Sequence, residues 1–267
     1  MDLSIIIRCC HDPKVFQCIE SVDESVEIIV SMCENMIIER RLKNMGIKYC
    51  IVPKGNLSIT SNRGLNIAQN SKVIITDSDT YFERGCIKKV YNVLDYYLAV
   101  SCKIIFLYSP KIIFSKIIAE ARDYVNSLDV IFTPGIGLKK EILPLIGGYY
   151  FNEKVPFGVD AELDFRIKNE SMPNKILNSA IVYHGPEKLN HDLKAAFRIG
   201  KGCRIGTLLL SKNKQFSDKN IELKAVKKSM YKDIIRRKGI FVFLYQLIWD
   251  FFYQLGWRYE RFKVLQC

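Results

Sequence analysis

Short runs of apolar residues alternate with stretches of helical character along the first 210 positions of the chain. Mainly apolar runs without polar alternation, which indicate strands buried on both faces, occupy residues 3–7, 26–31, 47–52 and 72–76. The stretches between them predict helices over residues 13–22, 37–45 and 59–69. Further on, strands are expected over 97–107 and 175–183, and helices over 112–125, 139–145, 161–168 and 188–210. This order predicts an α/β fold with helices on both faces of a mostly parallel, Rossmann-like sheet.

The pattern changes near residue 211, where a polar, linker-like stretch leads into basic residues and then into a long apolar run. We therefore expect a main α/β domain over residues 1–210 and a basic, aromatic helical extension over residues 211–267. The apolar run GIFVFLYQLIWDFFYQLGW carries one narrow polar stripe, formed by Gln246, Asp250 and Gln254. Because Asp250 would be costly inside a bilayer, the run predicts a helix on an anionic membrane surface rather than a spanning one. A helix packed on the main domain is the alternative.

The composition of the chain bears on whether it folds, which partners it binds and in which compartment it works. Of the 267 residues, 49% are hydrophobic, so we expect a folded chain. Its formal net charge of +12 favours anionic partners. Much of the charge lies in the tail among aromatic residues, and no nucleic-acid recognition motif is present, so we expect no nucleic-acid partner. The nine cysteines form no CxxC pair, and the first apolar run is too short for a signal peptide. These features predict a cytoplasmic protein with buried thiols, peripheral on the inner face of the cell membrane.

The sharpest local motif is Asp77-Ser78-Asp79, directly after the strand KVIIT. Ligands of α/β proteins lie at the carboxyl ends of the parallel strands. Two carboxylates at such a point can share a divalent cation, Mn²⁺ or Mg²⁺, and a ribose hydroxyl. The alternative is a turn that caps the next helix.

The N-terminal part of the chain resembles the family 2 glycosyltransferases in four ordered segments. These are LSIII, NLSITSNRGLNIAQNSKVIITDSDTYF, GIGLKKEILPLIGGYY and FGVDAELDFRI, within roughly residues 3–206. The resemblance implies a GT-A fold, a nucleotide-diphosphate sugar donor, a divalent cation and inversion at the sugar.

On the donor side, the resemblance makes Asp79 a metal ligand, Asp77 a ribose contact and Arg63 a contact to the base or phosphates. The alternative for Arg63 is a solvated helix residue. The segment after the second strand lacks the family's Asp-rich turn, and Glu34 is our substitute for it in nucleotide binding. Uridine, guanosine and thymidine donors all stay open.

On the acceptor side, Asp160 falls where the family has its catalytic base, with Glu162 as the fallback. A carboxylate there can take the proton from the attacking hydroxyl in a single displacement. The alternative for Asp160 is a helix N-cap. The resemblance also makes His184, at a strand end, a second metal ligand, whereas many such histidines are purely structural.

The sequence thus predicts an inverting glycosyltransferase that moves a sugar to a hydroxyl of a glycan or lipid-linked acceptor. A non-catalytic relative that serves as a binding or scaffold protein is the main alternative, because Val159 stands where the family has an acidic residue. A nucleotidyltransferase is less favoured, since no glycine-rich loop follows the first strand. We interpret Gly135-Ile136-Gly137 as flexible backbone near the acceptor, and Arg198, Lys201 and Arg204 as a solvated basic face or diphosphate contacts.

Overall fold

The structure is a computed structural model that describes residues 1–224 and 226–264, with side chains described up to Glu260. The strands are β1 (Leu3–Cys9), β2 (Glu27–Met32), β3 (Lys48–Ile51), β4 (Lys72–Asp77), β5 (Thr80–Phe82), β6 (Ala99–Phe106), β7 (Ile136–Lys139) and β8 (Asn174–His184). The α-helices are α1 (Val15–Glu20), α2 (Met36–Asn44), α3 (Leu57–Ile67), α4 (Cys86–Val93), α5 (Ser115–Asn126), α6 (Val159–Asn169), α7 (Leu189–Lys212), α8 (Tyr231–Lys238) and α9 (Ile240–Val264). Two 3₁₀ helices, η1 (Lys140–Ile146) and η2 (Lys228–Met230), complete the described elements.

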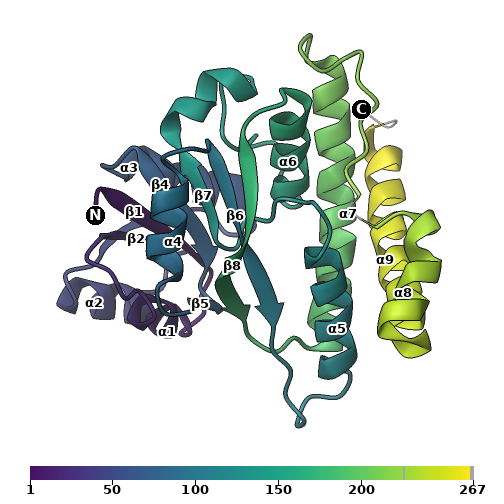
Figure 1. Ribbon diagram of the computed structural model, residues 1–267, viewed down its shortest axis with the longest axis horizontal. Helices are drawn as coiled ribbons and strands as arrows, with labels where there is room; N and C mark the ends of the chain where they lie inside the picture. Colours follow the sequence, from purple (N-terminus) through teal and green to yellow (C-terminus); the bar gives the residue numbers. More distant parts are fainter. Residues whose placement is uncertain (225, 265–267) are drawn as a thin grey trace.

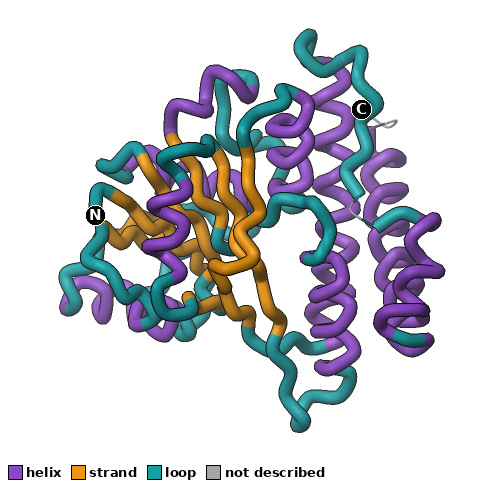
Figure 2. The backbone as a smooth tube through the Cα atoms, in the orientation of Figure 1, coloured by secondary structure: helices purple, strands orange, loops and turns teal. Residues whose placement is uncertain are grey.

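One mixed sheet organises the main domain, and helices surround it (Figure 2). Its strand order is β3-β2-β1-β4-β7-β6-β8-β5. Strands β3, β2, β1 and β4 are parallel, as are β6 and β8. Strand β7 runs antiparallel between β4 and β6, and β5 runs antiparallel along β8. The predicted α/β class with a mostly parallel sheet is confirmed, and the architecture is of the GT-A type with additional C-terminal helices.

Helices cover both faces of the sheet because the strands are apolar on both sides. Leu3, Ile5 and Ile7 of β1 face a core that α1, α2 and α4 complete, whereas Ile6 faces a second core under α3, η1 and α6. The same alternation sends the Arg8 side chain to the face on which Ile6 lies. This charged residue is buried at the carboxyl end of β1, where the site described below forms.

The interpretation of Gly135-Ile136-Gly137 as flexible backbone was wrong, because the segment leads into the buried strand β7. A Cβ on Gly137 would lie 2.6 Å from Cγ1 of Val90 on α4, so the glycine allows that helix to pack closely on the sheet. Strand β7 has only four residues, one of them a glycine, so it has no clear strand pattern in the sequence.

The C-terminal helices form a layer of their own beside the sheet, with α7, α9 and α8 next to one another (Figure 1). Helices α7 and α9 cross closely at two glycines: a Cβ on Gly200 would lie 2.0 Å from the Tyr253 carbonyl oxygen, and one on Gly256 would lie 2.0 Å from that of Phe197. The extension is thus attached to the main domain through α7. How the chain divides into domains at residue 210 stays a prediction.

Helix α9 turns two of the three residues of its polar stripe inward, toward its own domain, whereas Gln254 is exposed. Gln246 and Asp250 are only 2% and 5% exposed, and Asp250 accepts hydrogen bonds from Gln246 and Tyr231 and pairs with Lys224 at 2.9 Å. The structure therefore agrees with the alternative given for this apolar run, a helix that packs on the main domain. Among the described helices, none has the length and apolarity needed to cross a bilayer.

The described cysteines are all free thiols, and six of the eight are buried. This agrees with the expectation of mostly buried thiols. Cys267, the ninth, lies outside the described residues.

Candidate active site

A cleft of about 500 Å³ opens at the carboxyl ends of β1, β4, β6 and β8. Its walls come from the N-terminal ends of α3, α6 and α7 and from one face of α5. This volume lies within the usual range for small-molecule sites, and the position is where α/β sheets bind ligands. The cleft contains four of the sequence-predicted site residues, Asp77, Asp79, Asp160 and His184.

Three side chains in the cleft could together hold a divalent cation. Asp79, His184 and Glu187 each offer one ligand atom, and these atoms all lie within 4.8 Å of one another. Nε2 of His184 lies 3.5 Å from Oδ2 of Asp79 and 3.8 Å from Oε1 of Glu187. Nδ1 of His184 lies 2.9 Å from the Gly185 carbonyl oxygen, and a carbonyl can only accept, so Nδ1 carries the proton. Nε2 faces the two carboxylates, and in the neutral tautomer with the proton on Nδ1 it has the lone pair that a metal ligand requires.

The register of two short strands brings this group together. Thr80 of β5 pairs with His184 of β8, and the Gly185 amide donates to the Asp79 carbonyl oxygen at 3.1 Å. The Phe106 ring stacks on the His184 ring with centroids 4.5 Å apart, which fixes the plane of the imidazole. Sequence patterns had not predicted β5, whose three residues are too few for a periodic signal.

Glu187 is the residue of this group that sequence analysis missed. It lies two residues before α7, and Nδ1 of His191 in the first turn of that helix is 2.8 Å from its Oε2. That hydrogen bond raises the pKa of His191. Burial works to raise the pKa of Glu187, but the hydrogen bond from His191 and the charge of His184 outweigh it, and the pKa is lowered. An acidic residue three positions after His184 was the available signal.

Asp79 is partly buried and lies among other charged side chains. Burial raises the pKa of Asp79, the charge of His184 opposes the rise, and the carboxylates of Asp77 and Glu187 add to it. A divalent cation among these carboxylates would relieve the same repulsion.

Asp77 is held by an ion pair that the sequence did not predict. Nε and Nη2 of Arg8 donate to the two carboxylate oxygens of Asp77, each at 2.8 Å, and Nη2 also donates to Thr133 at 2.9 Å. The pair joins the ends of the neighbouring strands β1 and β4, whose register places Arg8 beside Asp77. Nη1 of Arg8 is buried with no hydrogen-bond partner among the described residues. The available sequence signal for this ion pair was Arg8 itself, a charged residue at the end of an apolar strand.

Asp160 lies in the first turn of α6 and lines the cleft. Burial raises the pKa of Asp160, while the charge of Arg8 and backbone N–H groups oppose the rise. The N-cap of α6 is Gly158, in the left-handed conformation, so capping is not the role of Asp160. A partly buried carboxyl with a raised pKa, open to a cleft, has the properties of a general base.

Glu162, the fallback base, is in a structural position instead. It is buried, forms a two-pronged ion pair with Arg166 at 2.8 and 2.9 Å, and accepts a hydrogen bond from Tyr149. It is not among the described residues that line the cleft. The fallback assignment is therefore wrong.

The remaining predicted residues are divided between cleft and surface. Glu34 and Arg63 are exposed and are not among the described residues that line the cleft, so their nucleotide-binding roles stay predictions. Arg198 lines the cleft, and its buried Nε has no hydrogen-bond partner among the described residues. Lys201 and Arg204 lie against α9, where they contact Tyr259 and Trp257.

The fold is similar to that of solved glycosyltransferases. S. aureus TarS 1-349 in complex with UDP-GlcNAc matches with a TM-score of 0.59 at 15% identity, over 80% of this chain and 68% of that chain. A second structure of S. aureus TarS 1-349 matches with a TM-score of 0.57 at 13% identity, over 80% of this chain and 66% of that chain. A longer S. aureus TarS structure matches over 90% of this chain but 43% of that chain, with a TM-score of 0.56 and 14% identity. No protein-family model and no curated protein matches the sequence.

Proposed function

We propose that this chain is an inverting glycosyltransferase that moves a sugar from a nucleotide-diphosphate donor to a hydroxyl of a glycan or lipid-linked acceptor. The observation that carries the proposal is that one cleft of a GT-A-type fold contains two separate features. One is the group Asp79, His184 and Glu187, which could bind a divalent cation, and the other is the carboxyl of Asp160, whose pKa is raised. An inverting displacement needs these two functions in one site, one for the leaving diphosphate and one for the attacking hydroxyl.

Asp79, His184 and Glu187 would hold the divalent cation, Mn²⁺ or Mg²⁺. Two carboxylate oxygens and one neutral imidazole nitrogen suit Mn²⁺ in particular, and Nε2 of His184 already faces the two carboxylates. When bound, the cation would neutralise the charge that develops on the leaving diphosphate. His191 orients Glu187 by its hydrogen bond, as residues behind metal ligands commonly do.

Asp160 would act as the base on the acceptor hydroxyl. Its raised pKa makes it a stronger base than a solvated aspartate. The charge of Arg8 favours the ionised form of Asp160, which is the form that accepts the proton. Asp160 would take the proton as the hydroxyl oxygen attacks the anomeric carbon opposite the diphosphate.

Asp77 and Arg198 would contact the donor. The Arg8 ion pair uses one lone pair on each Asp77 oxygen, and a carboxylate has further lone pairs for a ribose hydroxyl. The guanidinium of Arg198 lies over the Phe157 ring at 5.0 Å and has donors left for a phosphate. Since TarS has been solved with UDP-GlcNAc, uridine donors are the first to test.

Nucleotide binding can be tested without knowing the acceptor. With Mn²⁺ and a matching nucleoside diphosphate at about 100 times Kd, mass action should stabilise the protein by about 2.7 kcal/mol. In a chain of this size, that corresponds to a rise in Tm of roughly 5–10 °C. We expect Asp79→Ala to abolish the rise. Asp2→Ala, an exposed aspartate at the opposite end of β1, should keep it. No rise with uridine, guanosine or thymidine diphosphates would contradict the proposal and favour a non-catalytic scaffold.

We also propose that the outer face of α9 lies on an anionic membrane surface, which would bring the cleft close to a lipid-linked acceptor. Its exposed side chains form an apolar stripe at spacings of three and four: Phe241, Leu244, Ile248, Phe251 and Leu255. Exposed basic side chains lie near it on α8, at Lys232, Arg236 and Arg237, and on α9 at Arg258. An apolar stripe with neighbouring cations is the pattern of interfacial helices.

Vesicle binding tests this surface. Burying a phenylalanine contributes about 1.5–3 kcal/mol, so Phe241→Ser/Phe251→Ser should lower binding to phosphatidylglycerol vesicles at least about tenfold. These two side chains are 70% and 59% exposed, so the fold should not depend on them. Ile37→Ser, at an 82% exposed apolar residue on α2, is the control and should bind like the wild type. Equal binding of the double variant, or no binding by the wild type, would contradict the proposal.

A further inference from the structure

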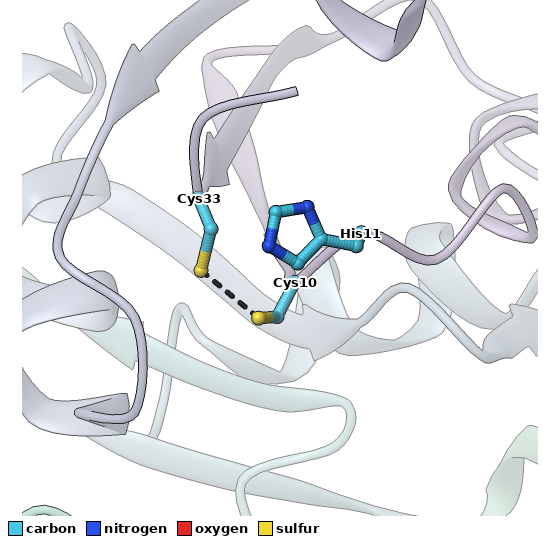
Figure 3. A group of neighbouring side chains, drawn as sticks. All are labelled: Cys10, His11 and Cys33. Atoms are coloured by element: carbon cyan, nitrogen blue, oxygen red, sulfur yellow. Dashed lines mark hydrogen bonds between the residues drawn. The ribbon is translucent and has the colours of Figure 1, made fainter.

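A second group of potential metal ligands lies on the cleft wall, away from Asp79. Cys10, His11 and Cys33 each offer one ligand atom, and these atoms all lie within 4.8 Å of one another (Figure 3). The two sulfur atoms are 3.0 Å apart. Cys10 and Cys33 both line the cleft, and Cys10 is exposed, so a solvent ion can reach them.

The register of the sheet creates this group. Cys9 of β1 pairs with Met32 of β2, so the residues that follow, Cys10 and Cys33, leave the sheet side by side. The Cys33 amide also donates to the Cys9 carbonyl oxygen at 3.1 Å, which continues the ladder up to the two thiols. Their relative position is therefore set by the backbone of two neighbouring strands, and the usual sequence spacings of zinc sites are not needed.

The backbone of His11 is unusual in a way that serves the same group. Its φ of 58° lies in the left-handed region, which is uncommon for residues other than glycine and is costly. In this conformation the imidazole turns back over the loop, and one ring nitrogen faces the two sulfurs (Figure 3). A pair of cysteines poised only for a disulfide would not need an imidazole at this point.

We propose that Cys10, Cys33 and His11 bind a borderline-soft divalent cation of the Zn²⁺ class, with the fourth position open to the cleft. Two thiolates and one imidazole form a ligand set that prefers Zn²⁺ to Mg²⁺ or Mn²⁺. Bond lengths of about 2.3 Å to sulfur and about 2.0 Å to nitrogen place these tetrahedral ligand atoms roughly 3.5–3.8 Å apart. Small side-chain movements would reach these separations from those observed, and the thiol protons would pass to solvent. This site is independent of the proposed transferase function.

Co²⁺ as a spectroscopic substitute for Zn²⁺ tests the proposal. The full chain, reduced with a non-thiol reductant, is titrated with Co²⁺ while thiolate-to-cobalt charge transfer and tetrahedral d–d bands are recorded. We expect the bands to saturate at about one equivalent and to disappear when Zn²⁺ is added. Carboxylate and imidazole ligands at Asp79, His184 and Glu187 give no thiolate band, so the two sites are distinguishable.

Variants complete the experiment. Cys10→Ser, at an exposed position, and Cys33→Ser should each abolish the thiolate band, and His11→Ala should weaken Co²⁺ binding at least about tenfold. Cys50→Ser is the control, because its thiol contacts Ser31 rather than this group, and it should keep the band, as should Asp79→Ala. No thiolate band in the wild type, or a band that survives Cys10→Ser and Cys33→Ser, would overturn the proposal. So would a Cys10–Cys33 disulfide in the aerobic protein together with no metal binding after reduction.

Discussion

Replacing Asp160 with asparagine is expected to lower kcat for sugar transfer by about 10²- to 10⁴-fold, the usual contribution of a general base. The change removes the proton acceptor but keeps the size of the side chain and its hydrogen bond from the Ala161 amide at 3.1 Å. Nucleotide-dependent stabilisation should persist, because the donor contacts lie on other residues. Transfer is measured as release of nucleoside diphosphate, with the donor that the thermal titration identifies.

The same residue predicts the pH dependence of the reaction. Because the pKa of Asp160 is raised in the folded protein, kcat/KM should fall as the pH drops through a value above the ordinary range for aspartate. The folded state also binds this proton more tightly than the unfolded chain, so the contribution of Asp160 to stability decreases as the pH rises through that pKa. Asp160→Asn should therefore be at least as stable as the wild type at neutral pH.

Asp164 on the same helix provides the matched control. Burial raises its pKa too, but it accepts from the Ile131 amide at 2.9 Å and is not among the described residues that line the cleft. Asp164→Asn should leave kcat within about threefold of the wild type, since surface and structural amide replacements have small effects on distant chemistry. Equal losses in the two variants, or full activity in Asp160→Asn, would contradict the role of Asp160 as base.

Replacing Arg166 with methionine is expected to lower the free energy of unfolding by about 3–5 kcal/mol, which is a large part of the stability of an ordinary domain. Arg166 is 0% exposed. Besides its ion pair with Glu162, it donates to the carbonyl oxygens of Ile146, Tyr149 and Tyr150 at 2.6–2.9 Å. Its removal leaves a buried carboxylate and three carbonyls without their donor. The loss is measured as the shift of the urea unfolding midpoint.

Two further variants separate the ion pair from general effects of substitution. Arg40→Met, at an exposed arginine on α2, should change the free energy of unfolding by less than about 0.5 kcal/mol. Glu162→Met/Arg166→Met should be less destabilised than Arg166→Met alone, because it leaves no unpaired buried charge. A loss below about 1 kcal/mol in Arg166→Met would contradict the structural role of the pair.

Most of the sheet was predictable because buried parallel strands are mainly apolar runs without polar alternation. Strands β1, β2, β3, β4, β6 and β8 and most of the helices lie within a few residues of their expected positions. The expectation failed at β5 and β7, which have three and four residues. Strands this short are stabilised by their neighbours in the sheet rather than by a local pattern, and helix α4 between β5 and β6 was likewise not predicted.

In the candidate site, too, some residues could be placed from the local sequence and others only from the tertiary structure. Asp77 and Asp79 directly follow a strand that was recognised, so their position at the edge of the sheet followed from the local sequence. Arg8 and Asp77 lie side by side only because of the register of β1 and β4. Glu162 has a structural role because its carboxylate pairs with the buried Arg166. Both outcomes depend on pairs of side chains, which single-residue patterns do not contain.

The sequence by itself determined the fold class and the strand-end position of Asp79, because burial and strand propensity act on neighbouring residues along the chain. It also determined that residues 239–257 form an amphipathic helix, although not which face points outward. The tertiary structure decided that α9 buries Gln246 and Asp250 and exposes its apolar stripe. It also decided that Glu187 joins Asp79 and His184, and that Cys10 meets Cys33. These contacts depend on strand register and helix packing, which bring together residues that are distant in sequence and share no local pattern.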